Sequence, residues 1–72
     1  MENTEIQIEK LKEEIKRCTN LKESYDDRNL PKQTILFAKT VIGIHIDNAK
    51  KAIVEGDIVR INETYQQLRA IK

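Results

Sequence analysis

The sequence predicts an all-α protein: two long helices form an antiparallel hairpin, a shorter third helix follows, and we expect this unit to assemble as a helical-bundle oligomer. Apolar residues recur every three or four positions, which is the period of one helix face. Turn-forming residues interrupt this pattern at only two places. A composition of 39% hydrophobic and 35% charged residues supports a packed core rather than a disordered chain. We expect residues 1–72 to form a single three-helix domain.

The first helix is expected from about residue 5 to residue 25. One of its faces is apolar, and after a small shift of phase the same stripe reaches the end of the segment: Ile8, Leu11, Ile15, Cys18, Leu21 and Tyr25. The charged side chains, Arg17 among them, fall on the other faces with mixed sign. That distribution is typical of a solvated surface.

A turn is expected at residues 26–31, because Pro31 restricts Leu30 to extended geometry. The second helix then runs from about residue 31 to residue 55. It would be roughly 37 Å long, close to the length of the first helix. Two consecutive helices of similar length joined by a short turn are expected to lie antiparallel.

The second helix has an unusually wide apolar face. On a wheel of about 100° per residue, its larger apolar residues form two ridges: Ile35, Ile42, Ile46 and Ile53 on one, and Phe37, Val41 and Ile44 on the other. Small residues such as Ala49 and Ala52 lie between the ridges and would let other helices approach closely. The apolar sector spans about 200°, against roughly 100° for a helix with one buried face. We therefore expect this helix to be the central one.

The second interruption of the pattern is at residues 55–57. Gly56 can take the left-handed conformation that often follows a helix, and Asp57 can cap the next helix. The third helix is expected from about residue 58 to residue 71, with an apolar stripe of Ile58, Ile61, Tyr65, Leu68 and Ile71.

The third helix would be only about 21 Å long, so it can cover little more than the C-terminal half of the second helix. The uncovered half should expose apolar side chains, and such a patch on a small protein usually marks an interaction site. A two-fold dimer is the simplest way to cover it. The expected partner-binding residues are Tyr25, Leu36, Phe37, Val41 and Ile44.

No pattern in the sequence predicts an enzyme, a metal site or a cofactor. Cys18 lies on an apolar stripe, where a thiol acts as a small hydrophobic group. His45 is the only histidine, and on an apolar seam we expect it to be a hydrogen-bonded core residue. With two glycines in all, no phosphate-binding loop can be formed. We therefore expect no catalytic, cofactor-binding or metal-binding residues.

Charge does not select a class of partner, because thirteen basic and twelve acidic residues leave a net charge of +1. Lys32, Lys39 and Lys50 line up along the outer edge of the second helix, but this basic stripe is thin. The third helix opens with Asp57, whereas a DNA-reading helix would be expected to carry Arg, Asn, Gln or Ser there. Nucleic acid is therefore the less favoured partner.

The expected location is the cytoplasm. The N-terminus lacks the basic and apolar segments of a signal peptide, and the longest apolar-rich stretch, residues 41–46, is too short to span a membrane. The single cysteine cannot form an intramolecular disulfide. We expect no membrane partner.

The sequence does not name a reaction or a target. The first hypothesis is a non-enzymatic protein–protein interaction module: a homo-oligomer, with a dimer favoured, that acts as a regulator, inhibitor or adaptor on a larger cytoplasmic protein. The alternative is a small helical nucleic-acid-binding regulator, and a third possibility is a structural subunit with open-ended association. A salt-dependent shift of generic DNA or RNA would separate the second hypothesis from the first.

Overall fold

The computed structural model describes residues 4–71, which form three α-helices packed against one another and no strand. The helices are α1 (Thr4–Ser24), α2 (Lys32–Glu55) and α3 (Ile58–Arg69), and a short 3-10 turn, η1 (Tyr25–Asp27), follows α1. The all-α prediction is confirmed. Pro31 stands at the N-cap of α2 rather than inside it.

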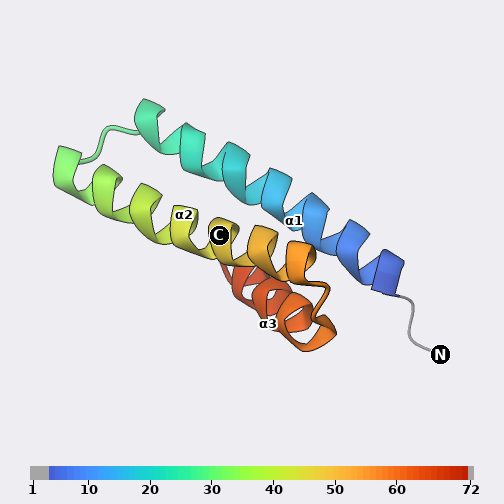
Figure 1. Ribbon diagram of the computed structural model, residues 1–72. Coiled ribbons are helices and arrows are strands. Elements are labelled where there is room, and N and C mark those ends of the chain that lie inside the picture. The colour runs from blue at the N-terminus through green and yellow to red at the C-terminus, as the bar shows by residue number, and fades with distance from the viewer. Residues whose placement is uncertain (1–3, 72) are drawn as a thin grey trace.

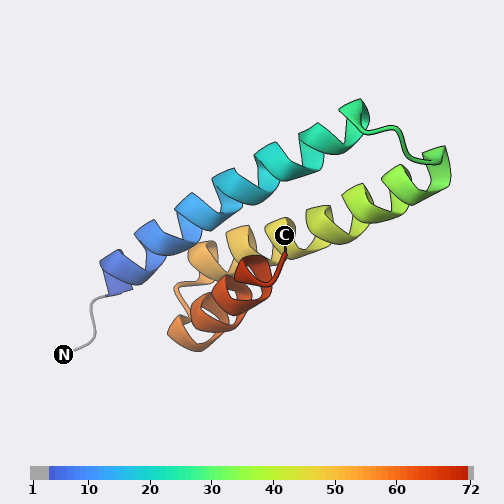
Figure 2. The same ribbon diagram turned by 180° about the vertical axis from the view of Figure 1, so that it is seen from behind.

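The helices form an elongated bundle of 47 × 17 × 15 Å. Figure 1 shows α1 and α2 side by side and running in opposite directions, with α3 against only one end of this pair. The reverse view in Figure 2 shows the same arrangement: α3 turns back from the end of α2 and stops near the middle of that helix. The end of the pair next to the α1–α2 connection therefore has no third helix.

The turn between α2 and α3 has the predicted chemistry. Gly56 follows α2 in the left-handed conformation with φ 68°, and its N–H donates to the carbonyls of Ala52 and Ile53 at 3.0 and 3.2 Å. The carboxylate of Asp57 accepts from the backbone N–H groups of Val59 and Arg60 at 3.0 and 3.5 Å. Each helix end thus has its own cap, and the chain reverses within two residues.

The core lies where all three helices meet. Its fully or almost fully buried apolar residues come from every helix: Leu11, Cys18, Ile42, Ile46, Ala49, Ala52, Ile61 and Leu68. Ala49 and Ala52 are completely buried, as expected for small residues that let α3 approach α2 closely. Thr64 is also buried, and its hydroxyl donates to helix carbonyls at 2.8 and 3.1 Å.

The end of the molecule next to the α1–α2 connection lacks buried side chains. Every buried residue of α2 lies at or after Ile42, and none of residues 19–41 is buried. Ile35 and Ala38 reach only intermediate exposure there. Two helices alone cannot surround a side chain, so this end lacks the third layer that α3 supplies at the other end.

None of the helices within residues 4–71 combines the length and the apolarity needed to cross a membrane.

Candidate interaction surface

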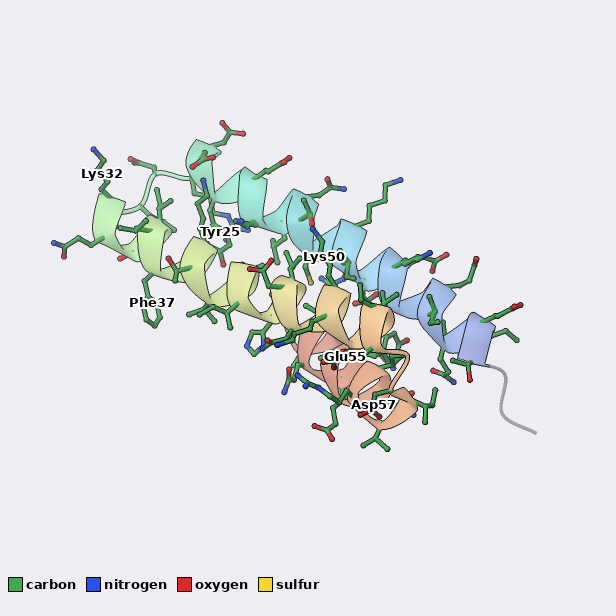
Figure 3. All side chains as sticks on the ribbon, in the orientation of Figure 1. Tyr25, Lys32, Phe37, Lys50, Glu55 and Asp57 are labelled. Carbon is green, nitrogen blue, oxygen red and sulfur yellow. The ribbon has the colours of Figure 1, made fainter. Side chains whose placement is uncertain are left out.

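The most exposed aromatic surface lies on the part of α2 that α3 does not reach. Phe37 is 72% exposed and Ile44 is 55% exposed, while Val41 between them is half-buried. At about 100° per residue these three side chains share one face of α2, which we call the Phe37 strip. In Figure 3, Phe37 points away from α1, on the side of α2 where α3 packs further along.

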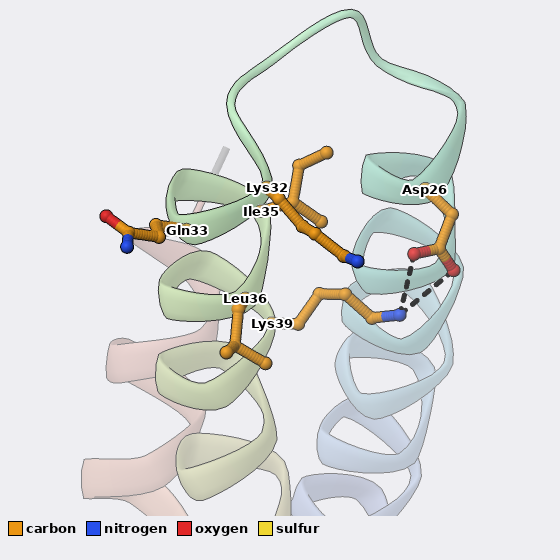
Figure 4. Close-up of a pocket in the computed structure, with 6 residues that line it drawn as sticks. All are labelled: Asp26, Lys32, Gln33, Ile35, Leu36 and Lys39. Carbon is orange, nitrogen blue, oxygen red and sulfur yellow. Dashed lines mark hydrogen bonds and ion pairs between the residues drawn. The ribbon is translucent and has the colours of Figure 1, made fainter.

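Leu36 does not belong to the Phe37 strip, although it is 67% exposed. It precedes Phe37 by one residue and is therefore rotated about 100° around the helix. Leu36 instead lines an open pocket of about 370 Å³ near the α1–α2 connection (Figure 4), whose other lining residues are Asp26, Lys32, Gln33, Ile35 and Lys39. The five residues expected to bind a partner thus do not form one patch.

Tyr25 is also separate from the Phe37 strip. It is half-buried and packs against the core, and in Figure 3 it lies between the ends of α1 and α2. The guanidinium of Arg28 lies 4.2 Å from the centre of its ring, which is a favourable cation–π distance. Tyr25 therefore helps to hold the connection in place, and its ring is already in contact on two sides.

Lys39 is held by an ion pair across the two helices. Its Nζ donates to both carboxylate oxygens of Asp26, at 2.8 and 2.9 Å, as Figure 4 shows. The positive charge at the centre of the predicted basic stripe is therefore compensated by a neighbouring carboxylate. Lys32 and Lys50 remain exposed, so the stripe is interrupted at its middle residue.

Arg17 fixes the point where α3 stops, a role that the sequence did not reveal. Its Nη2 donates to the carbonyls of Leu68 and Ile71 at 2.8 and 3.0 Å, and Nε donates to the carboxylate of Glu14 at 3.0 Å. The Leu68 carbonyl also accepts from the backbone N–H of Ile71 at 3.1 Å, so the guanidinium adds a bond to the C-terminal turn of α3 and to the residues that follow it. Arg17 is exposed, as expected for this face, but its bonds to a distant part of the chain were not expected.

Cys18 is completely buried, as its place on the apolar stripe predicts. Burial raises the pKa of its thiol, while the charge of Arg17 lowers it and that of Glu14 raises it. The thiol lies 3.6 Å from the carbonyl oxygen of Leu68. A protonated, enclosed thiol of this kind is a packing group rather than a nucleophile.

His45 differs from the expected hydrogen-bonded core histidine. It is half-buried, and its buried Nδ1 has no hydrogen-bond partner among the described residues. Among its neighbours one helical turn away, Val41, Ile42 and Ala49 have no side-chain group that could bond to Nδ1. Asn48 does carry an amide, but it makes no hydrogen bond to Nδ1.

Side chains that could bind a metal do not gather in the described part of the chain. Within residues 4–71, no group of three or more His, Cys, Asp and Glu side chains is placed to hold a metal ion. The feature that distinguishes this surface is therefore its apolar character, and the Phe37 strip is the part of it with an aromatic residue.

Comparison with known proteins finds no match to this chain among family models, curated proteins or solved structures.

Proposed function

We propose that the protein is a non-enzymatic protein–protein interaction module that acts as a homo-oligomer, with a dimer favoured. In this role it serves as a regulator, inhibitor or adaptor of a larger cytoplasmic protein. The observation that carries the proposal is the Phe37 strip: an aromatic ring, 72% exposed, on a helix face that the short α3 leaves uncovered.

The energetics of the strip support binding. Covering a Phe or Ile side chain that was exposed contributes about 1.5–3 kcal/mol each. Phe37 and Ile44 are both more than half exposed, so a partner that covers both gains a useful part of its binding free energy from two side chains. Aromatic residues at the centre of an interface are also the ones that most often dominate affinity.

Catalysis has weaker support. The pocket beside Leu36 is open. Of its three charged groups, Lys39 and Asp26 are bonded to each other, and the third is Lys32. Cys18 is enclosed, and burial raises the pKa of its thiol. These groups offer neither an activated nucleophile nor an acid–base pair poised to act on a substrate.

Nucleic-acid binding also has weaker support than protein binding. The Asp26–Lys39 ion pair compensates the middle charge of the basic stripe, and the carboxylate of Asp57 occupies the first N–H groups of α3. A phosphate approaching that helix end would meet a negative charge. The cytoplasmic location remains part of the proposal, supported by the buried free thiol of Cys18, which needs no oxidising compartment.

The test compares two substitutions of exposed apolar residues on α2. Phe37→Asp alters the strip, whereas Val54→Asp alters the 86% exposed Val54 near the α2–α3 turn. Light scattering at micromolar to millimolar protein should give an oligomeric mass for the wild type and for Val54→Asp. Phe37→Asp should give a monomer with unchanged helicity by circular dichroism, because an aspartate there cannot be desolvated cheaply.

Two results would contradict the proposal. A folded Phe37→Asp variant that keeps the wild-type mass would show that the strip is not the self-association surface. A wild-type protein that stays monomeric at the highest concentration would remove the homo-oligomer altogether.

A further inference from the structure

The Phe37 strip is the centre of a longer uncharged face of α2. The residues on this face, in chain order, are Gln33, Phe37, Thr40, Val41, Ile44 and Asn48. Only two charged residues occur between Gln33 and Asn48. Lys39 is bonded to Asp26 of the α1–α2 connection. Asp47 lies at the edge of the face, about 60° around the helix from Ile44 and about 20° from Thr40. An uncharged face is unusual in a chain that is 35% charged.

The spacing of this face is the same in both directions. Phe37 lies four residues after Gln33, and Ile44 lies four residues before Asn48. The midpoint of both pairs falls between Thr40 and Val41. Two such helices placed antiparallel about this centre would bring Phe37 against Ile44 of the second copy. Gln33 would likewise meet Asn48 of the second copy.

We infer that the occupant of this face is a second copy of this chain, paired through α2 in antiparallel orientation about a two-fold axis between Thr40 and Val41. This inference rests on the proposed homo-oligomer and specifies its geometry. A two-fold interface uses the same patch twice, so the patch must be complementary to itself. This face meets that condition: Phe37 opposes Ile44, Gln33 opposes Asn48, Thr40 opposes Val41, and no charge meets a like charge.

The bundle leaves room for this pairing. The contacts of Arg17 with Leu68 and Ile71 hold the end of α3 beside the middle of α1. Beyond that level, none of residues 19–41 is buried, so a second α2 can supply the missing layer. Each copy would cover the open half of the other.

The size of the face predicts a reversible dimer. A stretch of roughly 16 helical residues is about 24 Å long, and a helix is about 10 Å wide. The six residues of this face are far fewer than the roughly 20–30 residues per partner of a standard stable interface. The oligomer should therefore dissociate on dilution, and its test must include a concentration series.

Disulfide cross-linking tests the position of the axis. Val41→Cys places a thiol next to the axis, where its copy in the second chain is offset by about 1.5 Å along the helix. Asn48→Cys places thiols about 22 Å apart in the same dimer, and Leu36→Cys places an exposed thiol off the face. Under oxidised glutathione, Val41→Cys should form a covalent dimer at least tenfold faster than either control. The wild type provides the baseline, because its own Cys18 is buried.

A mixed pair gives a second arm, because the same axis brings Gln33 beside Asn48 of the second copy. Chains with Gln33→Cys and chains with Asn48→Cys should form the mixed disulfide when combined and little of either symmetrical one. Equal rates for Val41→Cys, Leu36→Cys and Asn48→Cys would indicate random collision and overturn the inferred pairing.

Introduced charges test the orientation independently. Phe37→Glu alone and Ile44→Lys alone should each weaken self-association at least tenfold, because each sets a charge against an apolar residue. The double variant should recover at least tenfold of the loss, since antiparallel pairing brings each new glutamate to a new lysine of the other chain. A parallel pairing would place like charges together, and the double variant would then be weaker than either single one.

The outcomes separate this inference from the proposed function. A concentration-dependent dimer with no preferential cross-link through Val41 and no recovery in the double variant would overturn the α2 pairing and leave the homo-oligomer in place. A wild-type monomer at all concentrations would overturn both. Circular dichroism on each variant establishes that its helices are intact before its mass is interpreted.

Discussion

Gly56 gives the sharpest prediction about folding, because the structure isolates one energetic term at this position. Its φ is 68°, and a Cβ built on it would meet nothing within 4 Å. A substitution there adds no clash, so its cost is the left-handed backbone alone. That cost is about 1–2 kcal/mol for a residue with a Cβ, and a β-branched residue lies at the upper end of this range or above it. Gly56→Val should therefore lower the free energy of unfolding by about 2 kcal/mol.

Gly43 is the matched control, with the opposite expected sign. It lies inside α2, where a new Cβ would be 3.5 Å from Nζ of Lys22, the far end of a flexible side chain. Gly43→Ala should stabilise the protein by about 0.5–1 kcal/mol, because glycine is costly within a helix.

Urea denaturation followed by circular dichroism measures both changes, and thermal melting checks them. A change of 1 kcal/mol shifts Tm by about 4–8 °C in a domain of this size. Both measurements need the same protein concentration for all variants, since association itself raises apparent stability. An unchanged denaturation midpoint for Gly56→Val would refute the reasoning about the α2–α3 turn.

Other substitutions test single contacts. Cys18→Ala and His45→Gln should leave self-association within a few-fold of wild type by light scattering; a folded variant that no longer associates would contradict their place in the interior. Cys18→Ala should lower stability by about 1–3 kcal/mol, and His45→Gln should cost less, because Nδ1 has no hydrogen bond to lose. Since burial raises the pKa of Cys18 above its unfolded value, wild-type stability should fall as pH rises above roughly 8.5, and Cys18→Ala should lack that part of the fall in urea titrations. Arg17→Met should lower the free energy of unfolding by about 1–2 kcal/mol and speed hydrogen exchange near residue 71, whereas Lys16→Met should do neither. Asp26→Asn should lower the free energy of unfolding by less than about 1 kcal/mol. If this substitution also conferred salt-dependent DNA binding, the basic stripe would be a latent site.

The local features of the fold were predictable because their causes lie within a few residues. Gly56 and Asp57 end one helix and start the next through bonds to residues at most four positions away. The stripe in the third helix identifies Ile61 and Leu68, both completely buried, because its period alone selects one face. These are the features for which a single sequence carries the full physical cause.

The contacts between helices were not predictable in the same way. Arg17 bonds to carbonyls more than fifty positions along the chain, and any of the basic residues beside the first stripe could have done so. Lys39 looked like part of a basic stripe, and only the placement of the α1–α2 connection brings Asp26 to it. Nothing in the types of these residues distinguishes a capping guanidinium or a paired amine from a solvated one.

The candidate surface falls between these two cases. The helical period by itself places Leu36 and Phe37 on different faces. The period therefore did not support the prediction that both residues form one binding surface with Tyr25. By contrast, the buried residues of α2 begin only at Ile42. That limit depends on where α3 stops, and the caps at both ends of α3 set that point. Since α3 is half as long as α2, it cannot cover both apolar ridges of α2 along their whole length. The exposure of Phe37 therefore follows from the shortness of α3, and the proposed partner would cover it together with Ile44.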